Sequence, residues 1–466
     1  MTKGIKILIL FFCFVIITPS FANEAKEYNL NDLLALSKIN NAEIKIAEGR
    51  LKVSRLKCDE ATAKYSPNLL LTSGHLNAYQ DLSLTRSLVE NNFSRSPFSP
   101  NINSYISDLV VSGSDTNGYS ALTDLRLSKT LFNWQIKYDV ELAKKSWELQ
   151  KVKYNAAIQD ISGTIVKAYF DLLLQHSKQA ALRKKVEILE AVSKEKEDDY
   201  KEGRVSSLDF EESLLNLNIA KRSLDTVGFD ISSLKEELAS FVWNDSSNDF
   251  TISSNLNFID NCPFVSSLEV VSLRGKLENN TEIQQLKLNE DINGLNQIKI
   301  EGNNRPNIDI IGGVNAFNLL KNLSDSYKYL NAKFYLGFNI QWTLLDFGKS
   351  LSQNNVRAGQ NIVDEELLKN KMNILRLKLN QSLRKNRYYE AQLAEIKERI
   401  NFMYKKVLFL EKQGEATERQ KILLATKLLL EDAQVDYRAA LLGKYELCFE
   451  VFKMIGGDIS DLQVKQ

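Results

Sequence analysis

Histidine is almost absent from this chain, which holds only two histidines in 466 residues. His75 falls in an alternating stretch and His176 in a long helical one, so neither has a partner at the spacing of a metal site or a catalytic triad. The glycine pairs Gly312-Gly313 and Gly456-Gly457 lie inside a strand-like run and at a helix end, where no phosphate-binding loop belongs. The sequence therefore predicts no enzyme, no metal and no cofactor.

Long apolar runs and a strong net charge are also missing. After the leader, no segment approaches the roughly 18 consecutive apolar residues of a membrane-spanning helix. In the leader, Lys3 and Lys6 precede an apolar run over 7–17, and small residues up to Ala22 suit cleavage, which predicts a secretory signal peptide over 1–22. The mature chain then carries 58 basic and 59 acidic residues. This balance gives no reason to expect nucleic-acid binding.

Cysteine and proline are scarce as well. Three cysteines remain after the leader, Cys58, Cys262 and Cys448, and their odd number and wide spacing predict buried thiols rather than a disulfide framework. The six prolines fall in the leader, in polar segments or at helix-to-strand junctions. None interrupts a predicted helix, where proline would cost about 3 kcal/mol.

A long helical hairpin dominates what is present. It runs as a helix from Gln135, a turn at 202–207 and a second helix ending at Trp243. After the turn, apolar or small residues recur at the three-four spacing of a coiled coil, at Phe210, Ser213, Leu217, Ala220, Leu224, Val227, Ile231, Leu234, Leu238 and Phe241. The arm before the turn has about 65 residues and would be roughly 100 Å long. A rod of this length must project or assemble with other rods.

Alternating segments predict four strands, at about 68–79, 119–132, 307–317 and 333–345, and residues 31–65 predict a helix capped by Asn29 or Asn31. In the last strand, apolar side chains from Phe334 to Leu344 share one parity. A strand of about 9–11 residues with one apolar face is the unit of an outer-membrane barrel; a half-buried strand in a soluble sheet is the alternative for any one of them. Trp134, Trp342 and Phe347, near the helix-proximal strand ends, are expected to form an interfacial aromatic girdle.

The chain contains an internal repeat of about 200 residues. The run Asn40-Asn41-Ala42-Glu43-Ile44 returns as Asn279-Asn280-Thr281-Glu282-Ile283, and Pro67 returns as Pro306, both 239 positions later. We expect a signal peptide over 1–22, a first repeat over 23–243, a linker over 244–267, a second repeat over 268–457 and a tail over 458–466. Four strands cannot close a barrel in lipid, and the smallest single-chain barrels have eight. Two or three copies must therefore combine.

These features resemble the TolC-type outer-membrane efflux and secretion channels. The two Asn-Asn-x-Glu-Ile helices, the strand exits at Leu131-Phe132-Asn133-Trp134 and Leu344-Leu345-Asp346-Phe347-Gly348, and the turn at 203–209 carry the resemblance over residues 28–457. It implies an α+β membrane protein in the outer membrane of a Gram-negative cell. Long coiled-coil hairpins would form a periplasmic α-barrel, and four transmembrane β-strands per chain would contribute to a shared 12-stranded β-barrel.

The resemblance also implies a function and partners. A homotrimer would act as a passive conduit in efflux or type I secretion, with a periplasmic adaptor protein and an inner-membrane pump of the RND, ABC or MFS type. The transported substrate stays unassigned. A periplasmic coiled-coil adaptor or a structural protein without a channel is the alternative.

The helix tips are the expected gate. By resemblance, Asp209 belongs to the periplasmic pore constriction. The second turn matches the family less well, so Glu418 and Arg419, with Asp209 and Arg204, are our hypothesis for a different closed-state latch. Adaptor docking is expected at the tips, at Gly203, Arg204, Val205, Ser206, Ser207, Gly414, Glu415, Ala416 and Thr417. A plain helix hairpin would explain the turn residues equally well.

Overall fold

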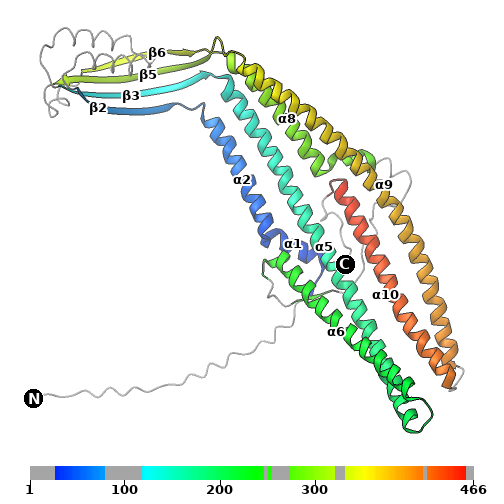
Figure 1. The fold of residues 1–466 in the computed structure, drawn as a ribbon. Helices are drawn as coiled ribbons and strands as arrows, with labels where there is room; N and C mark the ends of the chain where they lie inside the picture. The colour runs from blue at the N-terminus through cyan, green and yellow to red at the C-terminus, as the bar shows by residue number, and fades with distance from the viewer. Residues whose placement is uncertain are drawn as a thin grey trace, which may run out of the picture.

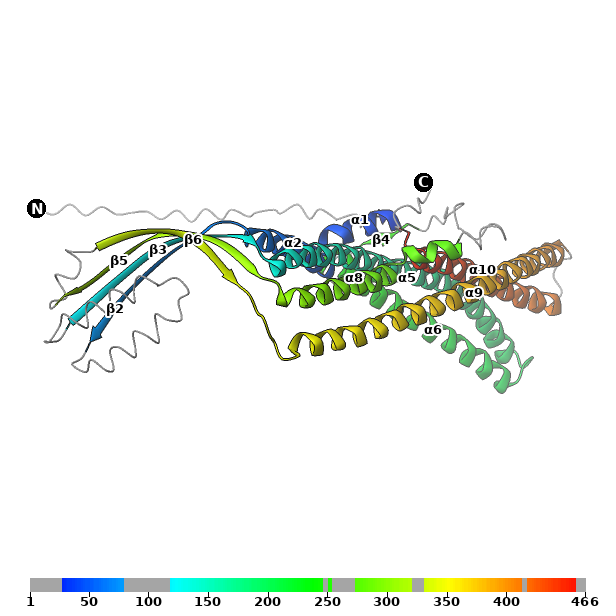
Figure 2. The same ribbon diagram turned by 90° about the horizontal axis from the view of Figure 1, so that it is seen from above.

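The chain folds into an elongated molecule with a β-sheet at one end and long helices running away from it (Figures 1 and 2). Its computed structural model describes residues 27–78, 118–245, 250–253, 273–320, 331–412 and 417–457. The predicted signal peptide and tail, most of the linker, and Cys262 lie outside these residues. The described elements follow the same order twice, as helix, two strands and a pair of long helices.

Two helices replace the single helix predicted over 31–65. Helix α1 spans Leu30–Asn40 and α2 spans Ala42–Ala63. Asn29, one of the two predicted caps, accepts a hydrogen bond from the backbone N–H of Asp32 at 2.9 Å. The break falls at Asn41, whose backbone is extended. Asparagine side chains compete for backbone hydrogen bonds and favour caps over helix interiors, so Asn41 ends one helix and starts the next.

Two antiparallel helical hairpins make up most of the molecule. The first joins α5 (Trp134–Lys201) to α6 (Ser207–Trp243), and the second joins α9 (Lys349–Lys412) to α10 (Thr417–Met454). The predicted seam of α6 faces α5, and five of its residues are buried: Ser213, Leu217, Ala220, Ile231 and Leu238. The coiled-coil prediction is confirmed for this hairpin.

The helices nearest the sheet lie in a row. Helix α2 packs on α5, α5 packs on α8 (Thr281–Glu301), and α8 packs on α9. The row continues the order of the strands above it, and both ends of the row are open (Figures 1 and 2). Asp139 on α5 ties three members of the row together, because it pairs with Lys64 at the end of α2 and with Lys299 on α8.

The four long strands form one antiparallel sheet in the order β2-β3-β5-β6. Its strands are β2 (Asn68–Ala78), β3 (Gly118–Phe132), β5 (Asn307–Leu320) and β6 (Asn331–Gln341). Strands β2 and β6 are the two edges. The fourth strand ends at Gln341 instead of residue 345 because its partner β5 begins at Asn307, directly after Pro306, which has no N–H to donate. Phe347 and Gly348 then turn the chain with positive φ angles of 49° and 87°.

The hydrophobic core lies at mid-length, where α1 packs against α5 and α6. Leu33, Leu172 and Leu238 are fully buried there. A short parallel pair, β1 (Glu27–Tyr28) and β4 (Thr251–Ile252), lies beside this core. The Tyr169 hydroxyl donates to the Ser253 carbonyl at 2.9 Å. Burial, followed by nearby carboxylates, raises the pKa of Tyr169 to about 12.

The cysteines differ in part from the expectation of buried thiols. Cys58 on α2 is a free, half-buried thiol, whereas the fully buried Cys448 on α10 is disulfide-bonded. Disulfides persist in oxidising compartments, and an odd cysteine count does not prevent one pair from forming. Separately, none of the described helices is long and apolar enough to cross a membrane.

Candidate functional sites in the sheet, the helix tips and the mid-length groove

The sheet has one apolar face that no part of the described chain covers. Strand register aligns alternate residues of all four strands on this face, so that Leu127 lies between Leu69 and Gly312, and Gly312 lies beside Leu336. The side chains of the edge strand β6 are strongly exposed, with Phe334 at 83% and Leu336 at 82%, whereas those of the inner strand β5 are half-buried. The remaining large members are Leu71, Leu125, Phe132, Ile308, Ile310, Val314, Phe338 and Ile340. Exposed apolar surface of this extent marks an interaction with lipid or protein.

The opposite face of the sheet is polar and internally bonded. The Tyr335 hydroxyl on β6 donates to the Asp124 carboxylate on β3 at 3.0 Å, across the intervening strand β5. Arg126 pairs with Asp124 at 3.1 Å and donates from Nε to the Tyr335 oxygen at 3.3 Å. Gly313 on β5 makes this bridge possible, because a Cβ there would lie 2.7 Å from the Tyr335 hydroxyl oxygen. The alternation of residues in the sequence predicted that this face would be polar. It gave no signal that Asp124, Arg126 and Tyr335 would bond to one another.

The three predicted girdle aromatics all lie at the helix-proximal end of the sheet. Trp134 opens α5 and donates from Nε1 to the Ile298 carbonyl at 3.2 Å, and Trp342 donates to the Asn304 carbonyl at 2.7 Å. Phe347 is 96% exposed. Trp134 needs Gly302 in the 3-10 turn η2 (Gly302–Asn304), since a Cβ at Gly302 would overlap the indole ring. Membrane contact of these rings remains a prediction.

The first tip is a tightly hydrogen-bonded turn. Gly203 has a φ of +75°, and the Arg204 N–H donates to the Asp199 carbonyl at 2.8 Å, which closes the end of α5. Ser206 and Asp209 cap α6 reciprocally, with each side chain accepting from the backbone N–H of the other. The Ser206 hydroxyl also donates to the Asp209 carboxylate at 2.7 Å. Hydrogen bonds from Ser206 lower the pKa of the fully exposed Asp209.

The predicted latch residues lie at the two helix tips, and their joint role as a latch stays a prediction. Arg204 forms ion pairs within its own turn, with Asp199 at 2.9 Å and Glu202 at 2.6 Å. Ser207 begins α6 and is exposed, and Val205 is half-buried. At the second tip, Gly414, Glu415 and Ala416 lie outside the described residues, and α10 begins at Thr417, followed by Glu418 and the exposed Arg419. Both tips lie at the same end of the molecule, far from the sheet (Figures 1 and 2).

Two asparagines, one in each repeat, connect the start of one helix to the end of another by the same set of hydrogen bonds. The Asn41 side chain accepts from the N–H groups of Glu43 and Ile44 and donates to the Phe241 carbonyl on α6 at 2.8 Å. Asn280 accepts equivalently at the start of α8 and donates to the Met454 carbonyl on α10 at 3.1 Å. The repeated Asn-Asn-x-Glu-Ile motif marked both residues, but the sequence did not show that they reach the end of the returning helix.

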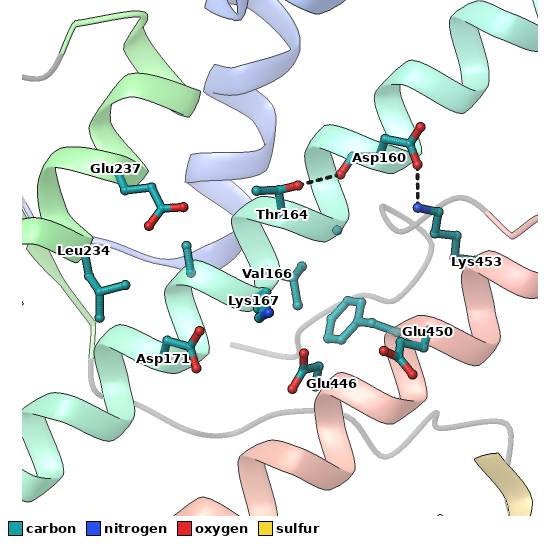
Figure 3. A pocket seen from close by; sticks show the side chains of 13 residues that line it. Asp160, Thr164, Val166, Lys167, Asp171, Leu234, Glu237, Glu446, Glu450 and Lys453 are labelled. Atoms are coloured by element: carbon teal, nitrogen blue, oxygen red, sulfur yellow. Dashed lines mark hydrogen bonds and ion pairs between the residues drawn. The ribbon is translucent and has the colours of Figure 1, made fainter. Parts of the chain in front are cut away.

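A groove of about 540 Å³ lies at mid-length between α5, α6 and α10 (Figure 3). Five carboxylates and two lysines line it: Asp160, Asp171, Glu237, Glu446, Glu450, Lys167 and Lys453. Lys453 and Asp160 form an ion pair at 2.5 Å across its rim. Burial raises the pKa of Asp171. Burial also raises the pKa of Glu446, and the nearby carboxylates of Glu450 and Asp171 add to this shift. Sequence reasoning missed this groove because its members come from three distant helices.

No group of metal-ligating side chains occurs among the described residues.

The fold is similar to that of several solved outer-membrane proteins. The outer membrane protein VceC from Vibrio cholerae aligns with a TM-score of 0.70 at 13% identity, over 92% of this chain and 96% of that one. The Campylobacter jejuni CmeC outer membrane channel aligns at 0.72 and 14% identity, over 92% and 85%. The open state of the Neisseria gonorrhoeae MtrE outer membrane channel aligns at 0.65 and 15% identity, over 92% and 89%. No protein-family model and no curated protein sequence matches the chain. The predicted TolC-type fold is therefore confirmed.

Proposed function

We propose that this chain is the outer-membrane channel of a tripartite efflux or type I secretion system, a passive conduit from periplasm to exterior. The observation that carries the proposal is the sheet with one uncovered apolar face, one polar face and two open edges, joined to helices about 100 Å long. Lipid suits the apolar face, and a water-filled lumen suits the polar one. The similar structures described as outer membrane channels agree with this function and with an outer-membrane location.

The open edges require further copies of the chain. Unpaired strand edges are not tolerated in lipid, so β6 of one copy must pair with β2 of the next. Like the sheet, the row of helices has two different open ends, so one end could pack against the other end in the next copy. Val53 on α2 and Leu367 on α9, at its two ends, are each about half exposed. A head-to-tail contact of this kind closes into a ring, and three copies give a 12-stranded barrel above a helical tunnel.

The far ends of the hairpins are the proposed gate and docking region. If the sheet lies in the outer membrane, the helices extend into the periplasm and their tips face the inner membrane. We assign the pore constriction to Asp209, Glu418 and Arg419. Adaptor docking is assigned to the two turns, 203–207 and 414–417. The inner-membrane pump would supply the energy and choose the substrate.

Reconstitution of the full chain in planar bilayers tests the proposal directly. We expect discrete conductance steps, heat-modifiable migration on gels and a trimer in detergent. A protein that fractionates with soluble proteins and gives no conductance would instead fit a periplasmic coiled-coil adaptor.

A further inference from the structure

We propose that the junction between sheet and helices binds the phosphate headgroups of anionic glycerophospholipids, through Lys129 on the sheet and Lys137 and Arg305 at the Trp134 ring. The inference rests on the proposed function, because it places the apolar sheet face in a membrane with the junction at its periplasmic surface. It adds a lipid-headgroup preference, carried by named cations, to the aromatic girdle predicted from the sequence.

Lys129 occupies an unusual position on the sheet. Strand alternation places it on the apolar face, with Ile310 as its partner on β5. Within the described part of the sheet, it is the only charged residue on that face. It lies one position beyond the end of β2, whose first residue, Asn68, pairs with Ser128. A lysine at the end of an apolar face can extend its stem along the hydrocarbon and place its ammonium group among the headgroups.

Two further cations flank the Trp134 ring a short distance along the chain. The Arg305 guanidinium carbon lies 3.6 Å from the centroid of the ring, and the Lys137 ammonium nitrogen lies 5.4 Å from it. Both side chains are exposed. The indole N–H is already bonded to a backbone carbonyl, so the ring is held in place as a platform for the two charges.

The three cations are not neutralised by the protein. None of them forms an ion pair with a carboxylate among the residues that the structure describes. Two acidic residues of the junction have other partners. Asp139 is shared by Lys64 and Lys299, and Asp346 accepts from the N–H groups of Gly348 and Ser350 at the start of α9. The junction therefore presents net positive charge beside two anchored tryptophans.

The cations lie at two levels of the junction, one inside the sheet and one beyond the strand ends. Lys129 is three residues inside the end of β3, roughly 10 Å along the strand. Lys137 and Arg305 lie beyond the strand ends, on the helix side. Cations at two levels of the junction, two of them against an indole ring, match the chemistry of an anionic phospholipid better than that of a neutral one.

Quenching of tryptophan fluorescence by brominated lipids tests this preference. The full chain is reconstituted in bilayers that contain either brominated phosphatidylglycerol or brominated phosphatidylcholine, and quenching gives the relative affinity of the two lipids for the surface near Trp134 and Trp342. We expect wild type to prefer phosphatidylglycerol several-fold. The preference should fall with each cation removed, and should approach unity in Lys129→Gln/Lys137→Gln/Arg305→Gln. Lys129→Arg should keep it.

A matched triple variant controls for net charge. Lys397→Gln/Lys405→Gln/Lys406→Gln removes three exposed charges from the tip half of α9 and should keep the preference. An equal affinity for the two lipids in wild type, or an unchanged preference in the junction triple while channel conductance persists, would overturn the inference and leave the proposed function intact. Failure of wild type to insert into either bilayer would overturn both.

Discussion

At the scale of single residues, Asn41 and Asn280 join distant parts of the chain. Each caps one helix and donates to a carbonyl at the end of another. Loss of a helix cap typically costs about 1 kcal/mol, and an unsatisfied, partly buried carbonyl adds a similar amount. The first asparagine of the motif, Asn40, makes no side-chain hydrogen bond among the described residues, so it offers a natural control.

We predict that Asn41→Ala lowers the free energy of unfolding by about 2 kcal/mol, measured as a lower apparent Tm of the helical signal in circular dichroism. Asn40→Ala should stay close to wild type. Equal losses in the two variants would show that the hydrogen bonds of the Asn41 side chain do not determine the effect.

Asp209 allows the structural and gating roles of the tip to be separated. It caps α6 together with Ser206, so Asp209→Ala removes both a cap and a negative charge. Ser206→Ala removes the partner in the cap and keeps the charge. We predict that single-channel conductance rises above wild type in Asp209→Ala and in Arg419→Ala, whereas Ser206→Ala stays near wild type. Unchanged conductance in both charge variants would reject the assignment of the constriction.

At the scale of elements, two carboxylates in the mid-length groove destabilise the folded state when they are ionised. The pKa values of Asp171 and Glu446 are raised above their ordinary 3.8 and 4.5. The folded state therefore holds these protons more tightly than the unfolded state. Stability falls as pH rises from the ordinary pKa to the raised one, and the loss stays constant above that window.

We predict that Glu446→Gln and Asp171→Asn each raise the apparent Tm at pH 7.5, because neutral side chains avoid the cost of ionisation in the groove. The gain should shrink as pH is lowered towards about 4, where the wild-type carboxyls become protonated. Glu195→Gln, an exposed position elsewhere on α5, serves as the control. A gain that does not depend on pH would contradict the electrostatic explanation.

Elements with a strong period were predictable from the sequence, and their ends often were not. The α6 seam and the two faces of β6 follow from local spacing alone, and α6 ends at the predicted Trp243. The break at Asn41 also involves a hydrogen bond to α6, about 200 residues away, which no local pattern shows. Likewise, β6 stops at Gln341 because β5 offers no further partner. Boundaries set by long-range contacts carry little local signal.

The candidate sites also divide into those that local sequence predicts and those that depend on contacts between distant parts of the chain. The turn with Gly203, Ser206 and Asp209 was readable because glycine and capping residues act within a few positions of the chain. The Asp124–Arg126–Tyr335 cluster was not, since it spans more than 200 positions and needs strand register. The bonded state of Cys448 was also missed, because cysteine spacing does not encode pairing.

At the scale of the whole molecule, the two ends of the helix row are the proposed contact between copies. Ile46, Val53 and Leu56 form an exposed stripe on α2, and each is at least half exposed. We predict that Val53→Asp shifts the trimer towards monomers in light scattering, because an unpaired carboxylate would be buried at the contact. Lys52→Asp, the exposed neighbour outside the stripe, should leave the trimer intact. Dissociation of both variants would point to a general charge effect.

The open edges of the sheet also have a genetic consequence. Because no copy can complete the barrel alone, an altered copy that still pairs through one edge would prevent closure of every ring that contains it. With equal expression of the two forms and random assembly in threes, only about one ring in eight would be built wholly from normal chains. Alleles that damage one edge strand should therefore be dominant over wild type, whereas alleles that abolish the sheet altogether should be recessive.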